Sequence, residues 1–479
     1  MDNKLKQQTF YAVIWSALER FSVQGVQFIL SFVIARQLYP SDYGLMAMLA
    51  IFISLSQCFI DSGFSNALIQ KQNRTQVDYS TVFYFNVFVG ICVYLLLLLL
   101  SSCISDFYNQ PILKELIKWV GLNLIINSFA TVQRTILIIK LNFKRQAIIS
   151  FVSAIISGCI AIYMAITGFG VWTLVIQGLL NSSITVVLLW ISSNWKPCFM
   201  FSRTSFKELF SFGSKIMVSG LIATFSDQLN TIVIGKLFPS RDLGNYSKGS
   251  TLPYYTSSNI ANILDRTFYP ILCQYQDDNE MLEKTFYKFI RISAFLVFPM
   301  TILLLLLAEP FIRIVLTDKW IGAVKYMEIL CLAYMWHPII RITWNLLNVK
   351  HRSDLSLKAE VIKRTCAIIV LLLSAPFGIE AICWGQCIYS LFDIIVITQM
   401  TKKVINGVNL KNHIMNIYQI CLQVIIMAIV VVIIRTVVSN TFLQLFCGLL
   451  IGGGTYILIS LICKSKELSL ILNMIKRKV

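Results

Sequence analysis

Charged residues are scarce in this chain of 479 residues. Only 13% of the side chains are Asp, Glu, Lys or Arg, there are three histidines, and 57% of the residues are hydrophobic. With a mean hydropathy of +0.73, the composition is too apolar for a water-soluble globular protein of this size. The alternation of polar and apolar residues typical of spanning β-strands is also absent, so helices rather than a barrel are expected in the membrane.

Motifs for metal binding and catalysis are missing as well. The 13 cysteines are scattered through apolar runs without a CxxC pair or a Cys/His cluster, so we expect small buried hydrophobic residues rather than disulfides or a metal site. The acidic cluster Asp277-Asp278-Asn279-Glu280 could hold Mg²⁺ in a glycosyltransferase, but no soluble domain surrounds it. No nucleophile with a matching base is visible. We therefore expect neither an enzyme nor a cofactor.

The sequence contains several long runs without a charged residue. A spanning helix needs about 20 mainly apolar residues, and the segments 79–105, 414–434 and 436–463 carry no charge. Within the longer uncharged run 146–195, Gly168-Phe169-Gly170 supplies a turn between two antiparallel spans. We expect an all-α integral membrane protein with about 14 transmembrane helices, near residues 10–36, 43–69, 79–105, 114–138, 146–167, 171–192, 208–237, 246–274, 285–308, 321–349, 358–376, 378–400, 414–437 and 442–463.

The formal charge of +18 first suggests nucleic acid, but the placement of the charges favours a membrane. With the N-terminus inside, cytoplasmic segments hold most of the Lys and Arg residues, for example Lys140, Lys144, Arg145, Lys350, Arg352, Lys363, Arg364, Lys476, Arg477 and Lys478. This asymmetry follows the positive-inside rule. It predicts that both termini are cytoplasmic, and no nucleic-acid partner is expected.

The sequence indicates an internal duplication. The phrase Ala35-Arg36-Gln37-Leu38-Tyr39-Pro40-Ser41-Asp42-Tyr43-Gly44 returns, with one gap and one insertion, as Val233-Ile234-Gly235-Lys236-Leu237-Phe238-Pro239-Ser240-Arg241-Asp242-Leu243-Gly244. A second match at nearly the same spacing joins the turn at 168–174 to Phe377-Gly378-Ile379-Glu380-Ala381-Ile382. Six spans, an even number, precede the basic linker after Trp195, so both halves run in the same sense, as in transporters built of parallel repeats.

These repeats suggest a division into lobes with a cavity between them. We assign residues 1–195 to an N-terminal lobe, 196–207 to a cytoplasmic linker, 208–403 to a C-terminal lobe, and 404–479 to two extra helices with a basic cytoplasmic tail.

Ionisable side chains inside the predicted spans are the candidate functional residues, because a charge at membrane depth is costly unless it faces a bundle interior or a wet cavity. The candidate anion-binding residues are Arg20, Arg266, Arg134 and Arg341, since a guanidinium stays charged and binds phosphate with two donors. The residues that could balance them or bind a coupling cation are Glu19, Asp61, Asp227 and Asp265. Three alternatives stay open: Glu19, Arg20 and Arg134 snorkel to the interface, Asp61 caps a broken helix, or the polar side chains of 259–266 hydrogen-bond between helices.

In the order and spacing of its motifs, nearly the whole chain resembles the polysaccharide transporter branch of the MOP superfamily (multidrug, oligosaccharidyl-lipid and polysaccharide exporters). It is similar to the O-antigen and colanic-acid type flippases, often called lipopolysaccharide biosynthesis proteins. The residues that carry the resemblance are Trp15 with Glu19-Arg20, the phrase at 35–44 and its return at 237–246, Phe143-Lys144-Arg145, Gly168 to Trp172, Pro270 and Asp318-Lys319-Trp320.

The resemblance implies a V-shaped fold of two six-helix lobes in the bacterial cytoplasmic membrane. It implies that an undecaprenyl-pyrophosphate-linked oligosaccharide moves to the periplasmic leaflet by alternating access, for O-antigen, capsule or exopolysaccharide. H⁺ or Na⁺ could couple this transport, and a polysaccharide polymerase and chain-length regulator could be partners. A multidrug or cation antiporter shares the fold, but we expect an acidic pocket with fewer arginines there. A membrane glycan polymerase or ligase would carry a long outside loop, which the sequence lacks.

Overall fold

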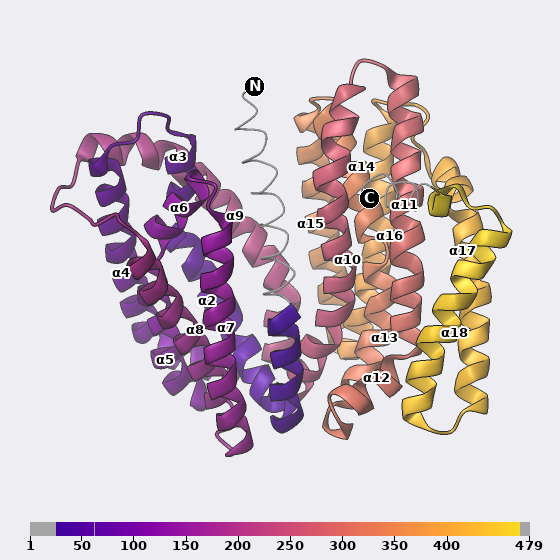
Figure 1. Ribbon diagram of the computed structural model, residues 1–479, viewed down its shortest axis with the longest axis horizontal. Helices are drawn as coiled ribbons and strands as arrows, with labels where there is room; N and C mark the ends of the chain where they lie inside the picture. The colour runs from indigo at the N-terminus through magenta and orange to yellow at the C-terminus, as the bar shows by residue number, and fades with distance from the viewer. Residues whose placement is uncertain (1–24, 62, 470–479) are drawn as a thin grey trace. The chain divides into compact units, whose positions relative to one another are not determined.

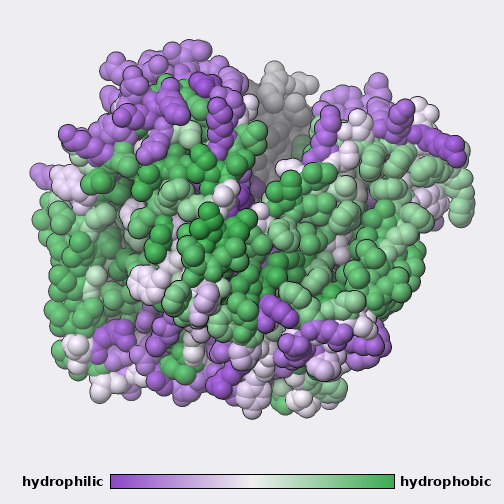
Figure 2. All heavy atoms as spheres, turned by 180° about the vertical axis from the view of Figure 1, so that it is seen from behind, coloured by the Kyte–Doolittle hydropathy of each residue, from purple (hydrophilic) through white to green (hydrophobic). Residues whose placement is uncertain are grey.

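The protein is described here by a computed structural model that covers residues 25–61 and 63–469. By its contacts the chain divides into two compact units, which meet in sequence at Gly244 and Asn245. The described residues form helices and turns, with no strand among them. In each unit hydrophobic side chains occupy the middle and hydrophilic side chains gather at both ends (Figure 2), as expected for helices that cross a membrane.

The helices are labelled in Figure 1. The described part of the first unit starts with the helix Gly25–Gln37, followed by α2 (Pro40–Asp61), α3 (Phe64–Gln70), α4 (Gln76–Tyr108), α5 (Ile112–Ser128), α6 (Thr131–Ile139), α7 (Phe143–Ile166), α8 (Trp172–Ser192) and α9 (Arg203–Leu237). Helix α10 (Ser240–Gln274) runs from the first unit into the second. The second unit continues with α11 (Asn279–Leu306), α12 (Ala308–Val315), η1 (Asp318–Trp320), α13 (Ala323–Tyr334), α14 (His337–Val349), α15 (Ser353–Ser374), η2 (Ala375–Phe377), α16 (Ile379–Lys402), α17 (Leu410–Val437) and α18 (Thr441–Ile462).

Nine helices in the described part of the chain are long and apolar enough to cross a membrane, or ten if the bent pair α5 and α6 forms one span. This confirms an all-helical protein that crosses the membrane many times. Helices α10 and α15 also occupy predicted spans but are more polar, and α13 and α14 are short. The count of 14 spans therefore stays a prediction.

Breaks in three of the predicted spans correct the expectation of continuous helices. The span 43–69 is divided into α2 and α3, 114–138 into α5 and α6 with a bend of 41°, and 321–349 into α13 and α14. At the first break Gly63 has a φ of 68°, and a Cβ atom there would lie 2.4 Å from the carbonyl oxygen of Gly213. Only glycine combines a left-handed backbone with such a close approach of α9.

Helix α9 begins within the predicted linker and packs into the first unit. Leu209 is buried in one hydrophobic cluster with Phe64 and Leu68 of α3. The Phe206 and Phe210 rings are stacked, with their centroids 5.3 Å apart, and the centroid of the Phe210 ring lies 6.1 Å from that of the Phe64 ring. Contacts thus place α9 with the helices before it, whereas the predicted lobes place 208–237 with the helices after it. The lobe boundaries stay a prediction.

Equivalent turns support the internal duplication. Leu141 after α6 and His351 after α14 both have left-handed backbones, with φ of 52° and 55°. In each turn the next residue donates a 2.9 Å backbone hydrogen bond to the carbonyl five residues back, Asn142 to Leu137 and Arg352 to Leu347, as in a Schellman motif. The same turn thus follows the second helix of a broken span in each unit, in keeping with the duplication; turns of this kind also end α4 at Asn109 and α18 at Lys464.

Helices α17 and α18 form an antiparallel pair on the second unit, α17 beside α11 (Figure 1). The Tyr456 hydroxyl donates a 2.9 Å hydrogen bond to the carbonyl of Phe295 on α11, and Arg435 donates a 2.8 Å bond to the carbonyl of Leu306. The predicted pair of extra helices is therefore attached through buried polar contacts as well as apolar packing.

Most of the cysteines are not buried, contrary to the expectation from the sequence. Only Cys331, Cys383 and Cys387 are buried; the other ten are partly or fully exposed. The surface of a membrane helix faces hydrocarbon that is as apolar as a protein core, so a small apolar thiol need not be buried there.

Candidate functional site

Arg341 and Asp265 form an ion pair in the second unit. Nη2 of Arg341 on α14 lies 2.7 Å from Oδ2 of Asp265 on α10. The other carboxylate oxygen accepts a 3.1 Å hydrogen bond from Nδ2 of Asn345. The Arg341 side chain is 44% exposed, whereas that of Asp265 is 15% exposed. The carboxylate therefore orients a guanidinium that still has accessible donors.

Helix periodicity arranges further groups beside this pair. His337, Arg341 and Asn345 are spaced four residues apart on α14 and so share one face. The ring of Tyr254 on α10 lies 6.4 Å from that of His337. We call this set the α10–α14 face; it consists of Tyr254, Asp265, His337, Arg341 and Asn345. It combines an aromatic ring, an amide and a guanidinium, which are groups suited to sugars and phosphate.

A second aspartate and arginine interact electrostatically in the first unit. Asp61 is the last residue of α2 and accepts a 3.2 Å hydrogen bond from Nε2 of Gln57. Arg134 on α6 acts electrostatically on the Asp61 carboxylate, and both residues are exposed. Helix α3 begins at Gly63 without a side-chain cap. The alternative in which Asp61 caps the broken helix is therefore wrong.

The two units thus share one arrangement. An aspartate comes from the helix that carries the glycine phrase, α2 or α10, and an arginine comes from the second half of a broken span, α6 or α14. The positions in the two repeats differ by about one helical turn, which keeps each side chain on a similar face. The sequence indicated these four residues separately; in the structure Asp265 and Arg341 form an ion pair, whereas Arg134 acts on Asp61 electrostatically.

The remaining candidates are placed differently. Arg266 is exposed on α10, but consecutive helical residues point about 100° apart, so it lies off the face of Asp265. Asp227 is exposed on α9 in the first unit. Glu19 and Arg20 lie outside the described residues.

The first unit contains a cavity of about 290 Å³ whose described lining is partly apolar and partly polar, without a charged side chain. Its polar residues are Gln27, Ser31, Tyr43, Ser157, Gln177 and Asn181. The Tyr43 hydroxyl donates a 3.4 Å hydrogen bond to the carbonyl of Ser31. The hydroxyl and amide groups of this lining can form hydrogen bonds with water or with sugar hydroxyls. Within residues 25–61 and 63–469, no three His, Cys, Asp or Glu side chains gather as a metal site.

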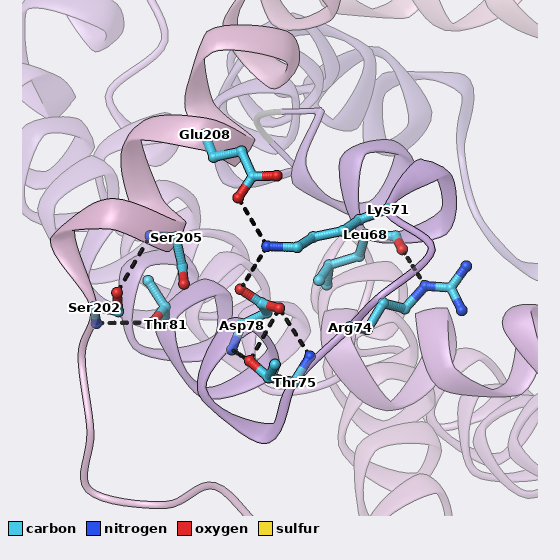
Figure 3. Close-up of polar contacts among 9 residues, drawn as sticks. All are labelled: Leu68, Lys71, Arg74, Thr75, Asp78, Thr81, Ser202, Ser205 and Glu208. Atoms are coloured by element: carbon cyan, nitrogen blue, oxygen red, sulfur yellow. Dashed lines mark hydrogen bonds and ion pairs between the residues drawn. The ribbon is translucent and has the colours of Figure 1, made fainter.

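An ion-pair network fixes the start of α9 (Figure 3). Nζ of Lys71 lies 3.1 Å from Oδ1 of Asp78 and 2.8 Å from Oε2 of Glu208. The buried Asp78 carboxylate also accepts hydrogen bonds from the backbone N–H and hydroxyl of Thr75, at 2.8 and 3.0 Å, in a capping box. The bond to Glu208 raises the pKa of Lys71, so the lysine stays charged. The network holds α9 against the turn between α3 and α4.

The second unit contains a buried ion pair that the sequence did not indicate. Lys363 was expected in a basic cytoplasmic segment, and its side on the membrane stays a prediction; the structure shows that it is 8% exposed and lies inside the helix bundle. Its Nζ is 3.0 Å from Oδ1 of Asp393 on α16. Asp393 is the only charged residue between Glu380 and Lys402. An isolated charge in an apolar helix is the signal that could have identified it.

Comparison with known proteins places these features in a family. The family model described as polysaccharide biosynthesis protein matches residues 33–325, more than half of the chain. The chain belongs to this family. It is a polysaccharide biosynthesis protein, the kind of protein that its motifs indicate.

Two relatives and one solved structure match most of this polysaccharide biosynthesis protein. An uncharacterized membrane protein in the cps region of Klebsiella pneumoniae is 24% identical over 470 residues, 97% of each chain. The lipopolysaccharide biosynthesis protein WzxC of Escherichia coli (strain K12) is 23% identical over 421 residues, 86% of this chain and 85% of WzxC. The lipid II flippase MurJ in its inward closed conformation is 15% identical, with a TM-score of 0.77 over 94% of this chain and 98% of MurJ. This last likeness confirms the MOP-type fold.

Proposed function

We propose that this protein carries an undecaprenyl-pyrophosphate-linked oligosaccharide from the cytoplasmic to the periplasmic leaflet of the bacterial cytoplasmic membrane. The observation that carries the proposal is the exposed guanidinium of Arg341, oriented by Asp265 within a predicted span. An isolated charge in hydrocarbon costs tens of kcal/mol by Born estimates, so a pyrophosphate needs a polar path. The guanidinium of Arg341 can form part of this path, because a guanidinium stays charged and binds phosphate oxygens with two donors.

The partner carboxylate fits a transport role. Asp265 competes with phosphate for Arg341, so a bound head group is released again once the carboxylate recaptures the guanidinium. Asn345 and Tyr254 offer an amide and an aromatic face to the sugars beside it. Arg134 provides a second exposed guanidinium in the first unit. The protein therefore binds its cargo without catalysing a reaction.

We also propose roles for the two lobes, the other charged residues, a coupling ion and partner proteins. The lobes 1–195 and 208–403 alternate access, Arg20 and Arg266 extend the anion path, and H⁺ or Na⁺ couples the movement. Asp61, Asp227, Asp265 and Glu19 balance the arginines. A polysaccharide polymerase and a chain-length regulator receive the flipped unit. The names of WzxC and MurJ, a lipopolysaccharide biosynthesis protein and a lipid II flippase, support this class of cargo.

A deletion strain tests the proposal. Without the protein, a lipid-linked repeat unit should accumulate on the inner leaflet, where a membrane-impermeant glycosidase or lectin reaches it in inside-out vesicles but not in spheroplasts. Plasmid-borne protein should restore the surface polysaccharide. An unchanged lipid-linked pool, together with drug resistance in a hypersensitive host, would point to an antiporter instead.

Arginine variants test the anion path. Arg20→Ala and Arg266→Ala should each reduce surface glycan at normal protein level. Arg313→Ala, in an exposed ion pair with Glu309, is the control and should export normally. If both Arg20→Ala and Arg266→Ala export like the control, these two residues do not bind the head group.

A further inference from the structure

Lys363 and Asp393 form a charged pair that the anion path does not use. Lys363 is 8% and Asp393 6% exposed, and both belong to helices that occupy predicted spans. The ammonium of Lys363 lies 3.0 Å from Oδ1 of Asp393, which is within hydrogen-bonding distance. A buried ion pair is a poor source of stability, because desolvation offsets the attraction. Ionisable residues inside a membrane protein are functional candidates by default.

The surroundings of Lys363 offer its ammonium a second position. Its Nζ lies 4.7 Å from the centre of the Trp344 ring on α14 and 3.9 Å from Oε2 of Glu360, one turn earlier on α15. The Glu360 side chain is 39% exposed and also accepts a 2.8 Å hydrogen bond from Arg364. The lysine therefore lies between a buried carboxylate and an exposed one.

The first repeat shows that the packing of these helices does not require the pair. Counted from the equivalent turns at Leu141 and His351, Lys363 corresponds to Ser153, which is fully buried and donates a 2.7 Å hydrogen bond to its own helix at Ile149. Counted from Gly170 and Gly378, which both have positive φ, Asp393 corresponds to Thr185. The same helix pair thus packs in the first unit without charge.

The charged and titratable groups near the pair come from three helices. Lys363, Glu360 and Arg364 of α15 act electrostatically on Asp393, and Asp393 acts on Tyr389 one turn earlier on α16. On α14, the charge of Lys363 acts electrostatically on His337. Cys366 of α15 also acts electrostatically on Tyr389.

We propose that Asp393 is a proton-binding site in which a proton from solution competes with the ammonium of Lys363. When the Asp393 carboxylate takes up a proton, it becomes a neutral acid, and Lys363 keeps its charge and moves to Glu360. The step adds one positive charge to the second unit, and exposed Glu360 connects the site to water. Resting on the proposed function, this site couples glycolipid transport to a pH gradient.

Trp344 is a built-in reporter that needs no glycolipid. We would titrate the fluorescence of the purified full-length protein from acidic to mildly alkaline pH, and take the difference between wild type and Trp344→Phe, because the chain has nine tryptophans. The difference signal should show one transition as Lys363 leaves Asp393. Asp393→Asn should abolish the transition, whereas Lys325→Met, in an exposed pair with Glu380, should keep it. A wild-type signal that is flat, or a transition that persists in Asp393→Asn, overturns the proposal.

A charge-free variant separates function from folding. Lys363→Met/Asp393→Leu should keep the thermal unfolding midpoint of the wild type, since apolar replacement of a buried pair is often neutral, yet lose surface glycan in the deletion strain. Lys325→Met/Glu380→Leu is the matched control and should export normally. Wild-type export by Lys363→Met/Asp393→Leu shows that the pair is structural and overturns the proposal. If the wild-type protein itself restores no glycan, the proposed function fails, while the fluorescence titration still decides the proton site.

Discussion

Gly44 and Gly244 face each other across the starts of α2 and α10. A Cβ atom on Gly44 would lie 1.7 Å from the carbonyl oxygen of Ser240, and one on Gly244 would lie 1.7 Å from that of Pro40 and 3.1 Å from the backbone nitrogen of Gly44. Each copy of the repeated phrase therefore presents its glycine to the helix start of the other copy. Only glycine lets two backbones approach so closely, which explains why both copies end in this residue.

Alanine at either position should destabilise the protein. A backbone carbonyl cannot move aside as a side chain can, so Gly44→Ala or Gly244→Ala should cost about 1–3 kcal/mol through overpacking. The thermal unfolding midpoint of the purified protein measures this loss. Gly453→Ala on α18, where a Cβ atom meets nothing within 4 Å, should be neutral or gain about 1 kcal/mol of helix propensity. Equal midpoints for Gly44→Ala and Gly453→Ala would contradict the reciprocal contact.

The break between α2 and α3 gives a second prediction. Gly63 and Gly168 both have positive φ, 68° and 85°, but only Gly63 is crowded, by the Gly213 carbonyl; nothing lies within 4 Å of a Cβ on Gly168. Asparagine tolerates a left-handed backbone. Gly63→Asn should therefore lower the unfolding midpoint, whereas Gly168→Asn should change it little. Similar midpoints would show that α9 does not approach the break.

The network around Lys71 predicts a strong local effect. Asp78→Ala removes a buried ion-pair partner and a helix cap, and should cost about 3 kcal/mol. Glu115→Ala removes the partner of Lys118 in an exposed pair, and should stay within about 0.5 kcal/mol. Denaturation of the two purified variants compares them directly. An Asp78→Ala variant as stable as Glu115→Ala would rule out the network as the anchor of α9.

Arg341 should be necessary for export beyond any effect on folding. A hydrogen bond to a charged group contributes about 1.5–3 kcal/mol, so Arg341→Ala should lower glycan export roughly tenfold or more. Arg341→Lys should be intermediate, because it keeps the charge but loses the planar fork. Surface glycan at matched protein level is the readout. If Arg341→Ala exports at the wild-type rate, the α10–α14 face does not bind the head group.

The sequence located several functional candidates but not their relationships. Asp61, Arg134, Asp265 and Arg341 stand out as charges in apolar surroundings. The ion pair of Asp265 with Arg341 joins helices far apart in the chain, which no local pattern reveals. Lys363 lies among other basic residues in the sequence, and such a cluster does not reveal which of its members is buried in the helix bundle. The break at Gly63 follows from the approach of α9, so it too depends on a distant segment.

Composition alone determined that this protein is helical and membrane-bound, because long uncharged runs are stable across hydrocarbon only as helices. The order of its motifs determined the family and revealed the duplication. Only the tertiary structure decided which charges meet, which are buried and where helices break. Periodicity assigns a residue to a face of its helix, but the helix packed against that face sets its partner and its exposure to water.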